Sequence, residues 1–122
     1  MRILVAERDP FWRRRWGALD LGAPLELVDD GTRALERAFA EPPAAVVCEV
    51  LLPGIDGLTL VRRLRAHPLT SPLPVAVVSS LPFGDRAREA GADLFSQKPL
   101  ADRDLRALVE RLLADRAQGR TP

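Results

Sequence analysis

Residues 46–57 read Val46-Val47-Cys48-Glu49-Val50-Leu51-Leu52-Pro53-Gly54-Ile55-Asp56-Gly57. An apolar run followed by a proline–glycine turn predicts a buried strand that ends at the carboxylate of Glu49. A second stretch has the same form, Ile3-Leu4-Val5-Ala6-Glu7-Arg8-Asp9-Pro10. The sequence therefore predicts two apolar strands that each end in an acidic side chain.

The whole chain alternates short apolar runs with segments of helical spacing, the pattern of an α/β fold with a doubly wound, five-stranded parallel sheet. The apolar runs lie at 2–6, 25–28, 45–50, 74–78 and 93–96. The predicted helices begin at Pro10, with Asp9 as N-cap, and then cover about 32–41, 57–66, 85–90 and 101–116. The fourth helix is shortened because Pro82 and Gly84 interrupt the segment before it.

The composition narrows the function classes. With 122 residues the chain has the size of one domain, which we place at 1–117, with a tail or the start of a linker at 118–122. A net charge of +1 creates no field that attracts nucleic acid or a membrane surface. One cysteine and one histidine exclude an internal disulfide and a zinc site of the usual ligands. Without an apolar membrane span or signal peptide, we expect a cytoplasmic domain.

Four side chains are predicted to meet at one edge of the sheet. Glu7, Glu49, Ser79 and Lys98 each lie at the end of a predicted strand. The carboxyl ends of parallel strands line one edge, where ligands bind in doubly wound folds. Lys98 is the only lysine beside 17 arginines, and its ammonium reaches anions as a compact point charge. The edge is therefore predicted to hold a phosphate or a buried ion pair.

Three motifs, which together span nearly the whole chain, resemble those of the receiver domain of bacterial response regulators. They are the acidic strand end before Asp9-Pro10, the run Leu51-Leu52-Pro53-Gly54-Ile55-Asp56-Gly57, and Lys98-Pro99. The resemblance implies a flavodoxin-like (βα)5 fold with strand order 2-1-3-4-5 and a role in two-component signal transduction and phosphorelay.

The resemblance also assigns positions in this chain. Glu49 stands at the phosphoacceptor position, where the family has aspartate, and Glu7 and Arg8 stand where it has two adjacent acids. Lys98 matches the family's invariant lysine. The switch positions, a hydroxyl and an aromatic, are Ser79 and Phe95. Phenylalanine lacks a hydroxyl that could anchor an exposed state, so burial favours its inward position.

Two of these positions depart from the family's chemistry. Arg8 places a permanent positive charge where a magnesium ligand belongs, so we expect no cofactor. Glu49 carries its carboxylate one methylene further out than aspartate does. Three alternatives stay open: Glu49 mimics a phosphorylated state by holding Lys98 and Ser79, or Arg8 pairs with Glu49 or Glu7 in a structural network that Lys98 joins, or the domain is still phosphorylated.

We therefore expect an atypical receiver, or pseudo-receiver, that acts by protein–protein interaction and is not an enzyme. The alternative is a receiver that accepts phosphate from a histidine kinase with Mg2+, using Glu49 or Asp56 as acceptor and Asp9 or Glu7 on the metal. A nucleotide-binding or phosphate-binding module ranks last because no glycine-rich loop follows a strand. The sequence names neither the partner nor the oligomeric state.

Other reactive side chains are assigned structural roles. Ser79 and His67 are predicted at opposite ends of the sheet, which excludes a hydrolase triad. Cys48 is predicted to be a small core side chain. Arg13-Arg14-Arg15 fan around one helix and are predicted to face solvent. Phe11 lies outside the helix stripe formed by Trp12, Trp16 and Leu19, so it is predicted either to contact a protein or to cover Arg8.

Overall fold

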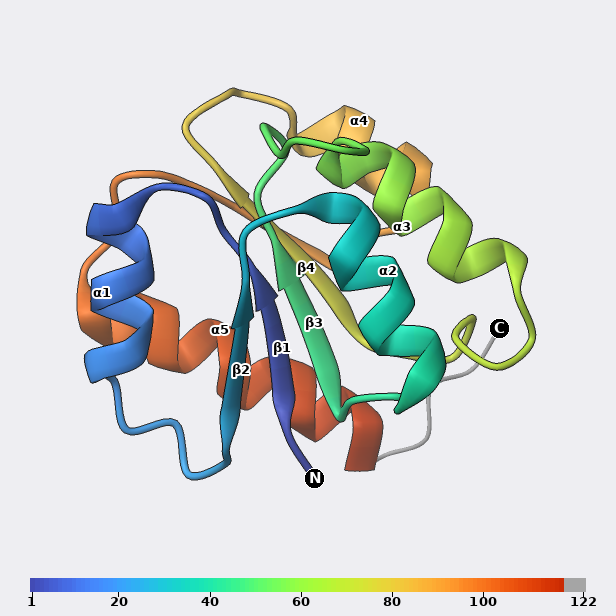
Figure 1. Cartoon of the computed structure of the whole chain (residues 1–122). Helices are drawn as coiled ribbons and strands as arrows, with labels where there is room; N and C mark the ends of the chain where they lie inside the picture. Colours follow the sequence, from blue (N-terminus) through green and yellow to red (C-terminus); the bar gives the residue numbers. More distant parts are fainter. Residues whose placement is uncertain (118–122) are drawn as a thin grey trace.

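The computed structural model describes residues 1–117, which form a five-stranded parallel sheet with five helices (Figure 1). The strands are β1 (Ile3–Ala6), β2 (Leu25–Val28), β3 (Ala45–Cys48), β4 (Val75–Ser79) and β5 (Leu94–Gln97). The helices are α1 (Pro10–Ala18), α2 (Gly31–Ala40), α3 (Gly57–Ala66), α4 (Gly84–Ala90) and α5 (Asp102–Ala117). The strand order β2-β1-β3-β4-β5 confirms the predicted fold.

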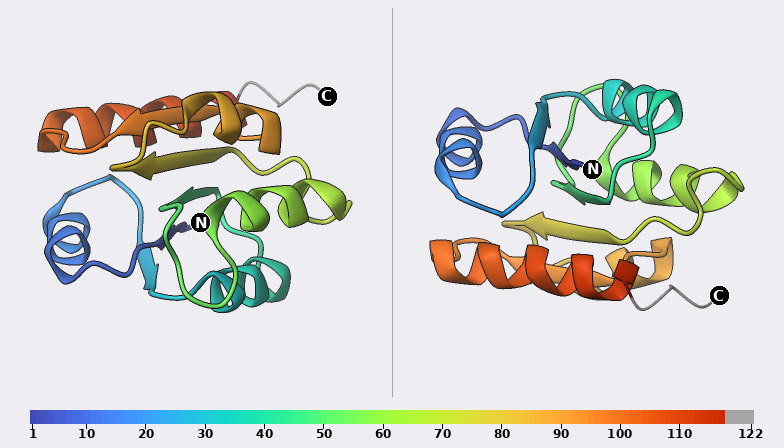
Figure 2. Two further views of the ribbon diagram at one scale, coloured as in Figure 1. Left: turned by 90° about the horizontal axis from the view of Figure 1, so that it is seen from above. Right: turned by 90° about the horizontal axis from the view of Figure 1, so that it is seen from below.

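Helices cover both faces of the sheet, so each strand can be apolar on both sides. Buried side chains of α1 and α5 form the core cluster on one face and those of α2, α3 and α4 form the cluster on the other, and Figure 2 shows α1 and α2 on opposite sides of the strands. Trp12 and Trp16 are buried with the α5 leucines on the first face, and Leu19 packs against that cluster. The predicted stripe on α1 therefore packs on the sheet as expected.

Three aspartates cap three of the five helices that begin at the carboxyl edge of the sheet. Asp9, Asp30 and Asp56 are the N-caps of α1, α2 and α3, and each accepts a hydrogen bond from a backbone N–H in the first turn. The loop before α3 also requires a glycine, because a Cβ on Gly57 would collide with the carbonyl oxygen of Glu49. This close approach fixes the backbone that carries Glu49.

The fourth helix is short, as predicted. Helix α4 has 7 residues and no side-chain cap, and it ends at Gly91, whose φ of 116° is in the left-handed region. It begins one residue earlier than expected, and α5 is shifted by one residue. The predicted tail at 118–122 lies outside the described residues. Within residues 1–117, no helix combines the length and apolarity needed to cross a membrane.

Candidate functional site

The candidate site lies at the carboxyl edge of the sheet, at the top of Figure 1. The backbone hydrogen bonds continue for one residue past the strands: the amide of Glu49 donates to the carbonyl of Ala6 at 3.0 Å, and the amide of Lys98 donates to that of Ser79 at 2.9 Å. The ends of β1 and β3, and those of β4 and β5, are thereby held in register. The structure thus brings Glu7, Glu49, Ser79 and Lys98 to one edge, as the sequence predicted.

The ammonium of Lys98 lies between the two carboxylates. Its Nζ is 2.5 Å from Oε1 of Glu7 and 3.0 Å from Oε1 of Glu49. The three side chains are only 7%, 3% and 7% exposed in the order Lys98, Glu7, Glu49. A buried charge is tolerated only when it is paired and hydrogen-bonded, and this cluster meets that condition.

The remaining carboxylate oxygens are also engaged. Oε2 of Glu7 accepts a hydrogen bond from the amide of Asp9 at 3.1 Å. Oε2 of Glu49 accepts from the amides of Val50 at 2.5 Å and Leu51 at 3.2 Å. Each oxygen of the two buried carboxylates therefore already has a donor. We call Glu7, Glu49 and Lys98 the acid–lysine cluster.

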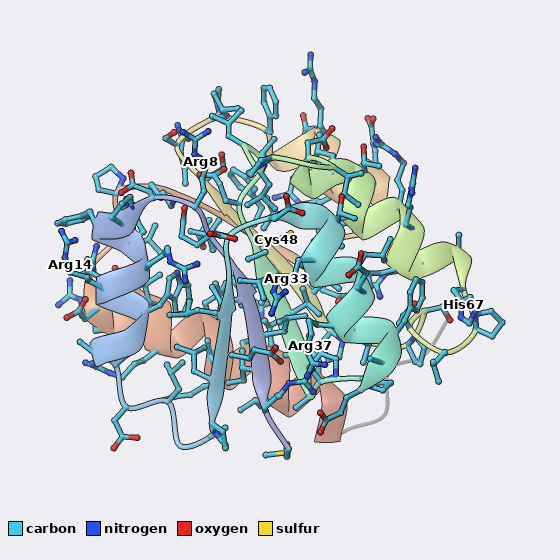
Figure 3. All side chains as sticks on the ribbon, in the orientation of Figure 1. Arg8, Arg14, Arg33, Arg37, Cys48 and His67 are labelled. Carbon is cyan, nitrogen blue, oxygen red and sulfur yellow. The ribbon has the colours of Figure 1, made fainter. Side chains whose placement is uncertain are left out.

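Arg8 does not belong to this cluster. Its side chain is exposed, and among residues 1–117 it forms no ion pair. Figure 3 shows Arg8 at the edge where the strands end. The prediction that Arg8 pairs with Glu49 or Glu7 is therefore wrong. Successive side chains of an extended chain point in opposite directions, so the burial of Glu7 turns Arg8 outward.

Asp9 and Asp56, the other acids considered for phosphate or metal, have capping roles. Oδ1 of Asp9 accepts from the amide of Phe11 at 2.8 Å. Oδ1 of Asp56 accepts from the amide of Thr59 at 2.8 Å, and its Oδ2 accepts from the Thr59 hydroxyl at 3.1 Å. Both carboxylates thus satisfy the first turn of a helix.

The two switch positions are held by local contacts. Ser79 is fully buried, and its Oγ accepts a hydrogen bond from the amide of Leu81 at 3.2 Å. Within residues 1–117 no hydrogen bond joins Ser79 to Glu49. Phe95 is half-buried and packs against the core cluster under α2, α3 and α4. The cluster therefore covers part of the Phe95 ring.

Trp12 connects the acid–lysine cluster to α1 and α5, a role that its place in the apolar stripe did not reveal. The Lys98 Nζ lies 4.8 Å from the centroid of its ring, and the Arg15 guanidinium carbon lies 4.5 Å from it. Arg15 also donates to the carbonyl of Leu100 at 2.7 Å and to Asp102 at 2.6 Å. Two cations near one ring add cation–π attraction at this junction.

The arginine run of α1 is therefore only partly solvated. Arg14 is exposed, as expected, but Arg13 donates to the carbonyl of Glu7 at 2.8 Å and Arg15 is held as described above. Glu7 is 6 residues from Arg13 along the chain, whereas Asp102 is 87 residues from Arg15. Helix periodicity alone gives no signal for the distant partner.

Cys48 and His67 lie apart from the site. The Cys48 side chain is buried in the core, and burial, with smaller effects from the charges of Glu49 and Asp56, raises its thiol pKa to about 12. His67 caps the far end of α3, and Figure 3 shows it well away from Arg8. Among residues 1–117, the buried Cys48 is therefore not a reactive thiol, and no hydrogen bond joins His67 to Ser79.

The residues at this edge do not fit a magnesium ion. Mg2+ needs oxygen ligands, but the facing oxygens of Glu7 and Glu49 already bind the Lys98 ammonium. Arg8, at the position where the resemblance implies a metal ligand, supplies a cation. Among the described residues no group of three or more His, Cys, Asp or Glu side chains is placed to hold a metal.

A cavity of about 480 Å3 opens above the acid–lysine cluster. The lining residues are Glu7, Arg8, Asp9, Trp12, Glu49, Leu51, Ser80, Lys98 and Pro99. A volume of this size is within the usual range of ligand pockets. The acid–lysine cluster belongs to the buried part of this lining, while Arg8, Asp9 and Leu51 belong to its exposed part.

Comparison with known proteins found a matching family model and relatives of similar sequence. The model of the response regulator receiver domain matches residues 3–110. Response regulator MprA of Mycobacterium leprae is 35% identical over 118 residues, which are 93% of this chain and 51% of that protein. Response regulator PleD of Caulobacter vibrioides is 38% identical over 86 residues, which are 68% of this chain and 19% of that protein.

The solved structures agree with these relatives. The signal receiver domain of a signal transduction histidine kinase from Syntrophus aciditrophicus superposes with a TM-score of 0.84 at 30% identity, covering 99% of this chain and 94% of that one. The chain spans about half of MprA and about a fifth of PleD. The shared part is therefore the receiver unit.

Proposed function

This chain belongs to the response regulator receiver domain family of two-component signalling, and on that premise we propose that it signals through protein contacts without phosphorylation of the acid at position 49. In this proposal the domain is a binding module and not an enzyme. Its partner is another protein, and Glu49, Glu7 and Lys98 have a structural role in presenting the surface to that partner.

The observation that carries the proposal is the position of Lys98 between Glu7 and Glu49. Phosphoryl transfer depends on cations that neutralise the phosphoryl oxygens, and the magnesium ion supplies most of that effect. Here the two carboxylates that could hold a metal are joined by Lys98 at 2.5 and 3.0 Å. A nucleophilic role for Glu49 would require this buried cluster to open.

The contacts of Glu49 favour a structural ion pair over a full mimic of phosphorylation. A mimic is expected to hold both Lys98 and Ser79. Glu49 contacts Lys98 at 3.0 Å, but Ser79 accepts a hydrogen bond from Leu81. The cluster therefore has one of the two contacts that a mimic needs. We propose that the domain has a single signalling conformation.

The proposal is tested by amide NMR spectra recorded with Mg2+ and then with beryllofluoride, a phosphoryl mimic. We expect no shifts near the acid–lysine cluster in the native domain. The Arg8→Asp/Glu49→Asp variant restores two acids of the family pattern, so we expect it to respond to both additions. An Arg14→Asp/Glu49→Asp variant is the matched control, because Arg14 is an exposed arginine of α1.

Two results would contradict the proposal. Shifts clustered around Glu7, Glu49, Ser79 and Lys98 in the native domain would show that the site still accepts a phosphoryl group with Mg2+. Phosphorylation of native Glu49 or Asp56 by a histidine kinase, detected by mass spectrometry of the intact protein, would do the same.

A further inference from the structure

Two exposed apolar side chains lie around the cavity above the acid–lysine cluster. Leu51 is 52% exposed and lines the cavity. Phe11 is 53% exposed and packs edge-on against Trp12, which also lines the cavity, with 5.6 Å between the ring centroids. Large apolar side chains exposed beside a concave site are typical of an interaction surface.

The charged side chains that line this cavity differ in whether they have a partner within the domain. Glu7, Glu49 and Lys98 bind one another and backbone amides, and Asp9 caps α1. Arg8 lines the same cavity, but within residues 1–117 it has no hydrogen bond or ion pair. Its guanidinium presents N–H donors in a planar fork that matches a carboxylate. Among the described lining residues, Arg8 is thus the charge without a partner.

We infer that this cavity docks a segment of a partner protein in which an acidic side chain neighbours a large apolar one. The carboxylate pairs with Arg8, and the apolar side chain enters the cavity between Trp12, Leu51 and Pro99. The inference rests on the proposed function, because a site engaged in phosphoryl transfer with Mg2+ needs the same space.

This assignment gives Arg8 a role that its position beside Glu7 does not otherwise explain. Each carboxylate oxygen of Glu7 and Glu49 already accepts a hydrogen bond from Lys98 or from a backbone amide, and Asp9, the third acid of the lining, caps α1 through Oδ1. An incoming cation would therefore have to share oxygens that are already engaged or bind at Asp9, whereas an incoming carboxylate meets the Arg8 guanidinium, which has no partner among residues 1–117. We therefore expect the acidic side chain of the partner to bind at Arg8.

The test uses a small carboxylate with an apolar end, 3-phenylpropanoate, and two analogues, 3-phenylpropanamide and 3-phenylpropylammonium. Amide NMR titrations are followed at Leu51, Ser80 and Lys98 in the native domain. We expect the carboxylate to bind in the millimolar range typical of a fragment of this size. The neutral amide should bind about threefold more weakly, as expected for the loss of one exposed ion pair.

Variants of the two exposed arginines complete the test. Arg8→Gln should weaken 3-phenylpropanoate binding about threefold and abolish the difference between acid and amide, while Arg14→Gln should change neither. The inference is overturned if the cavity amides do not shift with the carboxylate, if the amide or the ammonium binds as well, or if Arg8→Gln has no effect. These outcomes are separate from the beryllofluoride experiment, so either proposal can fail alone.

Discussion

Replacing Lys98 with methionine removes the ammonium that joins Glu7 and Glu49, and we expect it to lower the free energy of unfolding by about 3–5 kcal/mol. The size follows from burial, because the carboxylates are only 3% and 7% exposed and water cannot replace the lost partner. Methionine keeps an apolar stem beside Trp12, so lost packing contributes little. For a chain of 122 residues the change corresponds to a fall in Tm of about 10–20 °C.

The assay is urea unfolding followed by circular dichroism, with the denaturant slope compared between variants so that a change in midpoint reports stability alone. Arg103→Met is the control, because Arg103 and its partner Asp104 are 84% and 59% exposed at 3.9 Å and no measurable change is expected. Tryptophan fluorescence is a second readout, since Lys98 lies over the Trp12 ring.

A triple variant tests whether Lys98→Met loses stability because two carboxylates become unpaired or because the substitution disturbs the packing. Lys98→Met/Glu7→Gln/Glu49→Gln replaces both carboxylates by neutral amides, so it should recover at least half of the stability that Lys98→Met loses. The reasoning is refuted if Lys98→Met stays within about 1 kcal/mol of the native domain, the ordinary effect of a surface substitution. It is also refuted if the triple variant is less stable than the single one.

Three further predictions follow from other contacts. The Cys48 pKa of about 12 lowers its thiolate fraction at pH 8 about a thousandfold relative to the ordinary value of 9.0, so iodoacetamide should label it only after unfolding, as read by mass spectrometry. Hydrogen bonding to Arg37, more than to Arg2, lowers the pKa of Glu26 below 4.5, so this group adds stability at neutral pH that disappears as the pH falls through its folded value. Glu26→Gln should therefore be less stable at pH 7 by about 1 kcal/mol and equal to the native domain at pH 2, in urea titrations at both pH values. Asp56→Ala removes the α3 cap and should cost about 1 kcal/mol, whereas Asp56→Asn should retain most of it.

The fold was predictable because each of its signals is local. Apolar runs, aspartate caps and the short segment before Gly91 are read within a few residues, and parallel topology then brings the strand ends together. The convergence of Glu7, Glu49 and Lys98 on one edge followed from that topology without any knowledge of side-chain contacts.

The sequence did not predict in which direction the side chains at the carboxyl edge of the sheet point. One of the alternatives left open by the sequence paired Arg8 with Glu49 or Glu7, but adjacent side chains of an extended segment point in opposite directions, so Arg8 is turned away from the buried Glu7. The contact of Trp12 with Lys98 and that of Arg15 with Asp102 depend on how α1 is seated against the loop before α5. An apolar helix stripe predicts burial but does not identify neighbours from a distant segment.

The acid–lysine cluster also has a consequence for biosynthesis. Lys98 comes 91 residues after Glu7 and 49 after Glu49, so the ribosome delivers both acids well before their cation. A nascent chain that ends before Lys98 would have to place two unpaired carboxylates side by side, and their repulsion opposes docking of β1 on β3. Emergence of the last βα unit removes that penalty and simultaneously supplies Leu100 and Asp102 to Arg15. We therefore expect β1 and β3 to pair stably only after the segment that carries Lys98 has been synthesised.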